Sequence, residues 1–415
     1  MTTKPHDVVV FGATSFVGQI LARYLLEEFG LDGKLHWAAA GRSLPKLEAM
    51  RESLGKGADK LHLLQADAGD EASLQKLCRS ARVVVSTVGP YALYGEPLVR
   101  VCAESGTDYC DLTGEVQWMR RMIHGYEKKA QASGARIVHN CGFDSIPSDL
   151  GVHYLQQQAR ERFGQHCTTV KMRVRTMRGG FSGGTVASVL NVLQEVKANP
   201  ALRKELADPY SICPRVDDKG SGKRVRQANV GFAEYDPDFN AWIAPFVMSA
   251  VNTRVVHRTN ALLHDAYGPE FRYDEAVLTG RGLRGRLAAT ALSAGLGAFM
   301  VAGSIGTVRS LLEKHVLPAP GEGPSPDAQL KGGFDLRFLG RTKSGDALRT
   351  RVTGDRDPGY GSTAKMLGQA AACLASDISK IQVAGGFWTP AAIFGDRIVE
   401  RLQAHAGLTF AVLDK

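Results

Sequence analysis

The sequence has no C-x-x-C pair, although it contains seven cysteines among its 415 residues. An odd number of widely spaced cysteines argues against a disulfide framework and against the usual zinc-binding patterns. We therefore expect a cytoplasmic protein with reduced thiols and no metal site. The cysteines are Cys78, Cys102, Cys110, Cys141, Cys167, Cys213 and Cys373.

Blocks of like charge are also missing. The formal net charge is +9, but Lys and Arg are spread along the whole chain and no run of five or six like charges occurs. Nucleic-acid-binding arms usually contain such runs, so we expect no nucleic-acid partner. An anionic ligand, or an anionic membrane surface touched in passing, fits the charge. A mildly basic, solvated surface is the alternative that needs no partner.

A signal peptide is not expected at the start of the sequence. Met1–Asp7 is short and polar, and it lacks the basic start and the apolar run of such a peptide. The sequence has no internal repeat. Its length exceeds that of one ordinary core and predicts two to three domains.

Short apolar strands alternate with helical patterns as far as about residue 150. Uninterrupted apolar strands of this kind are typical of a parallel sheet that is covered on both faces. The sequence therefore predicts an α/β fold in which residues 1–150 form a Rossmann domain, a doubly wound parallel sheet with right-handed crossovers. The expected strands are 8–11, 35–40, 61–64, 83–85, 108–111 and 137–140.

The pattern changes after residue 150. Residues 169–176 alternate apolar and basic side chains, which is typical of a strand with one buried and one solvated face. Residues 334–339 and 347–352 are two further expected strands. We predict that 151–360 form a second, α+β domain with a mixed or antiparallel sheet, which binds substrate and forms a homodimer. Helical patterns then predict that 361–415 pack back on the Rossmann domain.

One segment, 287–308, contains no charged residue and is flanked by Arg281, Arg284, Arg286 and Arg309. Its length would suffice to span a membrane, but four glycines and several Ser and Thr make it only modestly apolar. Positive charge at both ends gives no orientation signal. We favour a buried or interface helix, with peripheral contact to a membrane or lipid as the first alternative and a true span as the second.

A glycine-rich turn follows the first expected strand, in the frame Gly-x-x-Ser-x-x-Gly. The first glycine permits a tight turn, and the last lets the helix pack closely on the strand. The helix start between them presents backbone N–H groups and a positive dipole end to a pyrophosphate, to which a serine hydroxyl could add a donor. We expect the pyrophosphate at Gly12, Thr14, Ser15, Phe16, Val17 and Gly18.

The end of the second strand predicts which nicotinamide cofactor binds. NAD-specific sites usually place Asp or Glu there to hold the ribose 2′-hydroxyl. This chain has Arg42 instead, followed by Ser43 and Lys46. A guanidinium pairs with a 2′-phosphate, which a carboxylate would repel. We therefore expect NADP(H).

Residues at the ends of the third and fourth strands complete the expected cofactor site, because ligands of such sheets bind at the strands' carboxyl ends. Asp67 could contact the adenine. The nicotinamide half is expected beside Thr87, Val88, Gly89 and Pro90. Each of the two stretches could equally be an ordinary turn.

Seven sequence stretches resemble the saccharopine dehydrogenase-like oxidoreductase family, and more narrowly its trans-acting enoyl reductase branch. The resemblance covers nearly the whole chain. The more specific stretches are CGFDSIPSDLG (141–151), DPGYGSTAKML (357–367) and GGFWTPAAIFGD (385–396). GATSFVG (12–18) and AGRS (40–43) are shared by many dinucleotide-binding folds, and STVGPY (86–91) and GTDYCDLTGE (106–115) complete the set.

The resemblance implies an N-terminal Rossmann domain, a central mixed-sheet domain and C-terminal elements that complete the fold. For the branch it implies NADPH-dependent reduction of a carbon–carbon double bond in a lipid or polyketide intermediate carried by a separate synthase. Two alternatives stay open. One is a saccharopine-type amino-acid dehydrogenase, although no cluster that would clamp its charged substrate is evident. The other is a non-catalytic NADP-binding protein associated with lipid.

A hydride transfer also needs a proton donor. Tyr91 follows the fourth strand, while Asp144 and Ser145 follow the last one, and these three are the catalytic candidates. The alternative for Tyr91 is packing or stacking on the cofactor. The alternative for Asp144 and Ser145, together with Asp149, is to cap the helix that begins near Pro147, and capping does not exclude contact with a ligand.

Overall fold

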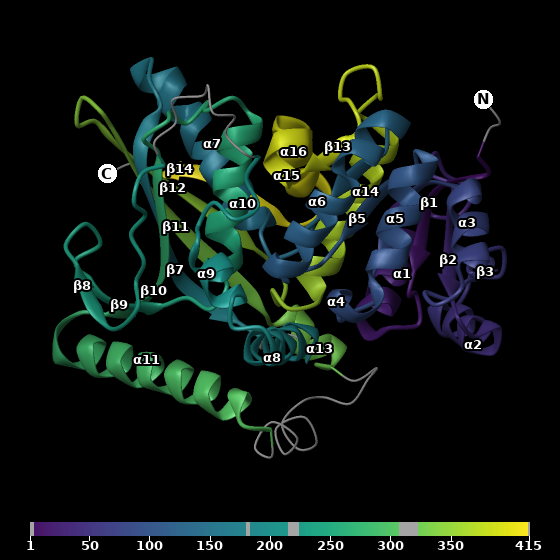
Figure 1. The fold of residues 1–415 in the computed structure, drawn as a ribbon, viewed down its shortest axis with the longest axis horizontal. Coiled ribbons are helices and arrows are strands. Elements are labelled where there is room, and N and C mark those ends of the chain that lie inside the picture. The colour runs from purple at the N-terminus through teal and green to yellow at the C-terminus, as the bar shows by residue number, and fades with distance from the viewer. Residues whose placement is uncertain (1–3, 180–182, 215–223, 307–322, 414–415) are drawn as a thin grey trace.

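The computed structural model describes residues 4–179, 183–214, 224–306 and 323–413. It contains a seven-stranded parallel sheet, sheet A, six strands of which come from the N-terminal part of the chain (Figure 1). The spatial order β13-β6-β5-β4-β1-β2-β3 reverses between β1 and β4, which confirms the doubly wound Rossmann arrangement. The strands are β1 (His6–Phe11), β2 (Trp37–Gly41), β3 (His62–Gln65), β4 (Ala81–Ser86), β5 (Asp108–Asp111), β6 (Arg136–Val138) and β13 (Gly386–Trp388).

Helices cover both faces of sheet A, which is why its central strands are apolar throughout. Val8, Val9 and Val10 of β1 are fully buried, as a strand between two helical layers requires. One layer holds α1 and α14, and the other holds α3, α5 and α6 (Figure 1). These helices, with the two short ones beside them, are α1 (Phe16–Phe29), α2 (Leu44–Leu54), α3 (Glu71–Ser80), α4 (Tyr91–Tyr94), α5 (Glu96–Ser105), α6 (Val116–Ser133) and α14 (Gly361–Ser376).

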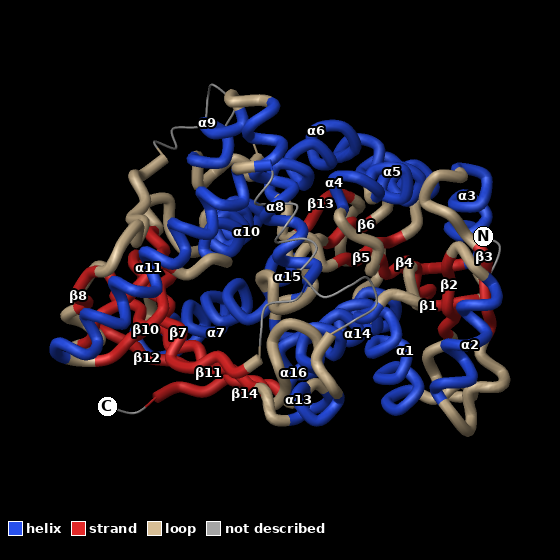
Figure 2. The backbone as a smooth tube through the Cα atoms, turned by 90° about the horizontal axis from the view of Figure 1, so that it is seen from below, coloured by secondary structure: helices blue, strands red, loops and turns tan. Residues whose placement is uncertain are grey.

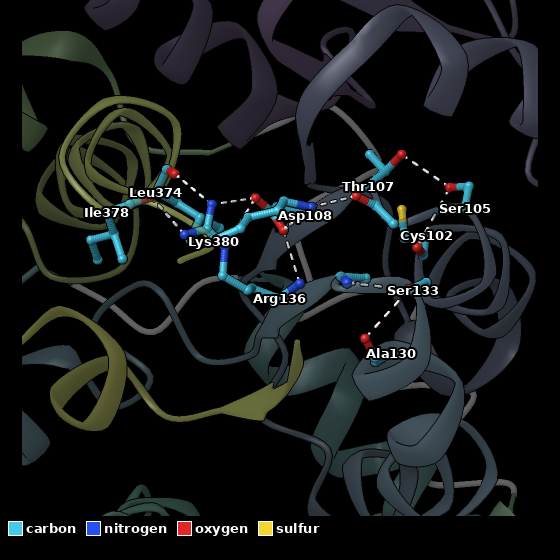
Figure 3. Close-up of polar contacts among 12 residues, drawn as sticks. Cys102, Ser105, Thr107, Asp108, Ala130, Ser133, Arg136, Leu374, Ile378 and Lys380 are labelled. Atoms are coloured by element: carbon cyan, nitrogen blue, oxygen red, sulfur yellow. Dashed lines mark hydrogen bonds and ion pairs between the residues drawn. The ribbon is translucent and has the colours of Figure 1, made fainter. Parts of the chain in front are cut away.

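A buried ion pair fastens α14 to sheet A (Figure 3). Arg136 on β6 donates from Nε to the Oδ2 of Asp108 on β5 at 3.1 Å, and both side chains are buried. The same guanidinium donates to the carbonyl oxygens of Leu374 and Ile378, at the end of α14 and just beyond it, at 3.0 and 2.7 Å. Every charge in this contact is therefore paired or hydrogen-bonded, as burial demands.

The second sheet, sheet B, has the order β14-β12-β11-β7-β10-β9-β8. Only β7 and β10 run parallel and the other neighbours are antiparallel, so the predicted mixed sheet is confirmed. Helices α7 and α10 pack on it, α7 so closely that a Cβ at Gly151 would lie 2.3 Å from the ring of Phe338. The strands are β7 (Cys167–Arg178), β8 (Glu234–Asp236), β9 (Ala241–Pro245), β10 (Arg272–Gly280), β11 (Gly333–Thr342), β12 (Ala347–Gly354) and β14 (Leu408–Leu413).

The C-terminal segment contributes to both sheets, beyond the helices expected there. β13 extends sheet A beside β6, whereas β14 extends sheet B beside β12 (Figure 2). Gly395, at φ 53°, separates two consecutive helices of this segment, α15 and α16. The helices outside sheet A's layers are α7 (Ile146–Phe163), α8 (Gly183–Ala198), α9 (Leu202–Ala207), α10 (Ser249–Leu262), α11 (Gly282–Ser304), α13 (Pro326–Leu330), α15 (Pro390–Phe394) and α16 (Asp396–His405).

Helix α11 contains most of the uncharged segment, and residues 307–308 of that segment lie outside the described residues. The preferred expectation was a buried or interface helix, and its buried form is wrong, because only 17% of the most apolar 18-residue window is buried. The interface form stays a prediction. Among the described residues it is the one helix long and apolar enough to cross a membrane, by length and composition alone. Figure 1 shows it along the lower edge of the molecule, below β9 and β10.

Candidate functional site

The turn between β1 and α1 has the geometry that the glycine frame predicts. Gly12 adopts φ 89°, and a Cβ there would lie 2.8 Å from the Oγ1 of Thr87 and 2.7 Å from Cγ2 of Val88. A Cβ at Gly18 would lie 2.2 Å from the carbonyl oxygen of Gly12. Both positions therefore require glycine, one for backbone conformation and both for close packing.

Ser15 is the N-cap of α1, and its hydroxyl is already occupied. Its Oγ accepts a hydrogen bond from the backbone N–H of Gly18 at 3.0 Å and lies 3.0 Å from the Oγ1 of Thr87. Thr87 in turn donates to the carbonyl oxygen of Gly12 at 2.9 Å. Because the hydroxyl proton of Thr87 is used in this bond, the hydroxyl of Ser15 is the donor in the contact between the two side chains. The Ser15 side chain therefore holds the shape of the turn. These hydrogen bonds do not support the expected role of its hydroxyl as a donor to the pyrophosphate.

The surface of the turn is open to a ligand. Thr14, Ser15, Phe16 and Val17 are all half-exposed, and the first turn of α1 carries no acidic residue. The ring of Phe16 contacts that of Tyr360 edge-on, with 4.7 Å between the centroids. A pyrophosphate therefore meets backbone N–H groups and the positive end of a helix dipole, with no nearby carboxylate on the helix to repel it.

Arg42, Ser43 and Lys46 gather where β2 ends and α2 begins. Arg42 and Lys46 are exposed, and no acidic residue occupies the first turn of α2. Ser43 is the N-cap of α2, but its side chain makes no capping hydrogen bond. Its hydroxyl differs in this from that of Ser15, which caps α1. Asp67, exposed beyond β3, accepts from the N–H of Gly69 at 2.9 Å. The residues present fit a dinucleotide that carries a 2′-phosphate.

The end of β4 is tied to the end of β5 by Glu115, a residue absent from the sequence-based set. Its carboxylate accepts from the backbone N–H groups of Tyr91 and Ala92 at 2.9 and 3.0 Å, and from the hydroxyl of Ser188 on α8 at 3.0 Å. These bonds fix the residues that follow Thr87, Val88, Gly89 and Pro90. The only sequence signal for Glu115 is its place in the strand-end loop after β5.

Tyr91 is buried, and its hydroxyl is hydrogen-bonded within the protein. The hydroxyl donates to the carbonyl oxygen of Ser86 at 2.9 Å, and the hydroxyl oxygen accepts from the N–H of Leu112 at 3.1 Å. Burial raises the pKa of Tyr91 well above its ordinary value. A phenol with both its donor and its acceptor engaged does not support the expected proton-donor role, and the packing alternative describes it better.

Ser145 is also directed into the protein. It is the N-cap of α7 by position, but its side chain does not cap; its hydroxyl donates to the Oδ1 of Asn252 on α10 at 3.0 Å. Asn252 in turn donates to Ser148 and to Glu275, at 3.0 and 2.9 Å. This buried series of hydrogen bonds joins the start of α7 to sheet B through α10. It supports neither side-chain capping nor direct ligand contact by Ser145.

Asp149 is buried farther along α7. Its carboxylate accepts from the hydroxyl of Thr259 at 2.6 Å and from the N–H of Ala391 at 2.8 Å. Burial raises its pKa to about 7. The residue thus joins α7 to α10 and α15 instead of capping the helix it belongs to.

Asp144 differs from Ser145 and Asp149 because it is partly exposed, and its carboxylate lies beside Gly142 and Gly114. A Cβ built on Gly142 would lie 3.0 Å from its Oδ2 and within 3 Å of Leu112 and Thr363, and a Cβ on Gly114 would lie 4.0 Å from its Oδ1. Desolvation raises the pKa of Asp144 to about 7, and the nearby charge of Asp111 adds to this. The raised pKa favours the protonated carboxyl group far more than in an ordinary aspartate.

Tyr360 lies beside the nucleotide turn, although the sequence offered it only as part of the DPGYGSTAKML stretch. Besides its contact with Phe16, its hydroxyl accepts from the backbone N–H of Gly183 at 2.9 Å, at the start of α8. Asp357 fixes this region by accepting from the N–H groups of Tyr360 and Gly361, each at 2.9 Å. The stretch thus joins α8, α14 and the turn.

A surface hollow of about 390 Å³ lies elsewhere, between α6, α8 and α9. Its cations Arg120 and Arg121 are paired with Glu205 and Glu195, so the hollow offers no excess positive charge. None of the strand-end residues described above lines it. We assign it no part in the site.

The comparisons with known proteins agree with this geometry. Residues 8–138 match the family model of the saccharopine dehydrogenase NADP binding domain. A protein of Mycobacterium tuberculosis (strain H37Rv) named "putative trans-acting enoyl reductase" is 42% identical over 97% of this chain and 96% of its own length. A trans-acting enoyl reductase of Mycobacterium ulcerans (strain Agy99) is 35% identical over 96% of both chains.

Among solved structures, the chain is similar to a histidine-tagged apo saccharopine dehydrogenase (L-Glu forming) from Saccharomyces cerevisiae. The TM-score is 0.53 over 99% of this chain and 100% of that one, at 13% sequence identity, which shows a shared fold. The sequence-based resemblance is thereby confirmed. The chain belongs to the trans-acting enoyl reductase family of saccharopine dehydrogenase-like, NADP-dependent oxidoreductases.

Proposed function

We propose that this protein is an NADPH-dependent enoyl reductase in which Asp144 donates the proton. The observation that carries the proposal is the half-exposed Asp144, whose pKa is about 7, at the carboxyl edge of sheet A. The carboxyl ends of the strands are where doubly wound sheets place their ligands. The full-length similarity to proteins named trans-acting enoyl reductases supports the reaction class.

Preference for NADPH rests on the surroundings of Arg42. A guanidinium fork can bind a 2′-phosphate through paired hydrogen bonds, and Ser43 and Lys46 add a hydroxyl and a second cation on the first turn of α2. No acidic residue of that turn offers the usual contact to a 2′-hydroxyl. The bound cofactor would supply the hydride that the reaction needs.

Reduction of an α,β-unsaturated thioester requires a proton at the α-carbon in addition to a hydride at the β-carbon. Asp144 can hold that proton near neutral pH because partial desolvation beside Gly114 and Gly142 disfavours its anion. Tyr91 and Ser145 have their hydroxyls engaged inside the protein. Asp144 is therefore the member of the sequence-based catalytic set that remains available to a substrate.

The substrate class is an acyl chain, lipid or polyketide, presented by a separate synthase. The names of the relatives include "trans-acting", which suits an enzyme that meets its substrate on another protein. The reaction would take place in the cytoplasm, where NADPH is maintained in its reduced form. The seven cysteines are free thiols in the structure, which suits a reducing compartment.

The test is to supply NADPH or NADH with an α,β-unsaturated acyl thioester, and in parallel NADP⁺ with saccharopine. Consumption of NADPH with formation of the saturated thioester is expected, with little use of NADH. Oxidation of saccharopine instead would replace the proposal with the amino-acid dehydrogenase alternative. Binding of NADPH without turnover of any unsaturated thioester would favour the non-catalytic alternative.

A further inference from the structure

Helix α11 presents an apolar surface that no described element covers. Its outward side chains include Leu283, Leu287, Leu292, Val301 and Ile305, and no charged residue occurs between Arg286 and the end of the helix. Leu287, near the N-terminal end of the helix, and Val301, near its C-terminal end, are 61% and 64% exposed. Exposed large apolar side chains thus lie toward both ends of the helix, with exposed Ala and Gly between them, and an uncharged exposed surface of this kind marks an interaction site.

The side of α11 that faces the protein carries small residues and is closely packed where they are buried. Gly285, Ala289 and Ser293 are buried on it, and a Cβ at Gly285 would lie 2.2 Å from the carbonyl oxygen of Gly280. At the other end, a Cβ at Gly303 would lie within 3 Å of Leu190 and Leu193 on α8. The protein therefore holds the helix over its N-terminal half and again near its C-terminal end. Crossing a bilayer would break these contacts, whereas lying flat on one would keep them.

The N-terminal end of α11 carries the positive charge. Arg281, Arg284 and Arg286 are all exposed there, and α11 contains no acidic residue. Arg286 lies over the ring of Trp242, 5.4 Å from its centroid, and Tyr235 contacts the same ring edge-on. Arginine beside Trp and Tyr, next to an apolar surface, is the arrangement that membrane interfaces favour.

A second copy of the chain fits this surface less well. A helix of 23 residues is roughly 35 Å long and roughly 10 Å wide, so its outline offers about 350 Å². A stable interface buries about 800 Å² on each partner. The arginines would also find no carboxylate on the matching helix.

We propose that α11 docks this protein on an anionic membrane surface, with its apolar side in the interface and its arginines at the lipid phosphates. The helix touches α8, and Ser188 of α8 binds Glu115 at the candidate site. Docking would thus hold α8 and the strand ends near the membrane. The inference concerns binding alone and stands without the proposed reaction.

The test is co-flotation of the full chain with vesicles of phosphatidylcholine alone or mixed with phosphatidylglycerol. We expect binding to the mixed vesicles, reduced at least tenfold in the double variant Leu287→Asp/Val301→Asp. Ile381→Asp is the matched control, because Ile381 is a 98% exposed apolar residue outside α11. Arg284→Gln should weaken binding about fivefold, the contribution of one cation near an anionic surface.

Absence of flotation with the anionic vesicles would overturn the proposal, and so would equal flotation of the double variant and the wild type. Size-exclusion chromatography provides the second readout. If the double variant turned a dimer into a monomer while no protein bound vesicles, the surface would be an interface between copies. Circular dichroism of each variant shows whether the fold is retained.

Discussion

The hydroxyl of Ser15 lies 3.0 Å from that of Thr87, so the cap of α1 is bonded to the end of β4. The two residues stand on either side of the point at which the strand order reverses. The bond fixes the shape of the pyrophosphate turn from within. Ser15 therefore makes the turn more rigid. The backbone N–H groups of the turn remain the groups that can bind a phosphate.

Two serines at helix N-caps offer a direct comparison. Ser15→Ala removes a capping hydrogen bond and should lower the free energy of unfolding by about 1 kcal/mol, measured by urea denaturation. Ser43→Ala removes a hydroxyl that caps nothing and should leave stability within about 0.5 kcal/mol while weakening NADPH binding. Equal loss of stability in the two variants would contradict the assigned roles.

Replacement of Arg42 should change the cofactor preference. Arg42→Glu places a carboxylate where the 2′-phosphate is expected and should reduce NADPH affinity by about 10- to 100-fold while NADH affinity holds or rises. Fluorescence titration with both cofactors measures the ratio. Lys56→Glu, an exposed change of the same charge just after α2, is the control. An unchanged ratio in Arg42→Glu would remove the phosphate-binding role.

The ion pair of Arg136 with Asp108 predicts a large asymmetry between single and double variants. Arg136→Met leaves the buried Asp108 without its main partner and should cost about 3–5 kcal/mol of stability. Arg136→Met combined with Asp108→Asn removes both charges and should recover part of that loss. A double variant that is less stable than the sum of the single ones would refute this account.

Asp149 makes the free energy of unfolding depend on pH. Its pKa is about 7 in the folded protein against an ordinary 3.8, so the folded state holds a proton that the unfolded chain has released between these values. Stability therefore falls as the pH rises through this window. Asp149→Asn should reduce that slope by up to about 1.4 kcal/mol per pH unit, measured by urea denaturation at several pH values. Asp32→Asn, at an exposed carboxylate, should leave it unchanged.

The sequence predicts sheet A well because most of its first six strands contain a short apolar run and alternate with helices that have a buried side. β5 was expected with the bounds the structure gives it. β13 could not be predicted in this way, because three residues from the far end of the chain reach sheet A through packing of α14 and α15. The same holds for β14, which joins the other sheet.

The exposure of α11 was hidden from the sequence for a different reason. The part of α11 after Arg286 contains no charged residue and so no polar face, and its sequence pattern does not distinguish a buried helix from a surface one. The catalytic candidates posed the same kind of problem. Tyr91, Asp144 and Ser145 all follow strands, and only their hydrogen-bond partners separate the two engaged hydroxyls from the available carboxyl group.

Asp144 is the residue on which the proposed reaction depends. Because a donor must be protonated, kcat should be constant at low pH and fall as the pH rises above about 7. Asp144→Asn cannot donate an acidic proton and should lower kcat by about 10²- to 10⁴-fold. Its affinity for NADPH should stay within about twofold, which shows that the fold and the nucleotide turn are retained. Asp144→Glu should restore part of the rate.

The most direct measurement is the single-turnover rate of NADPH oxidation with an α,β-unsaturated acyl thioester, followed across pH in the wild type and in Asp144→Asn. The account predicts a wild-type rate that declines above about pH 7 and a variant rate that is at least 100-fold lower and independent of pH in that range. A variant that keeps the wild-type rate and pH profile would contradict it.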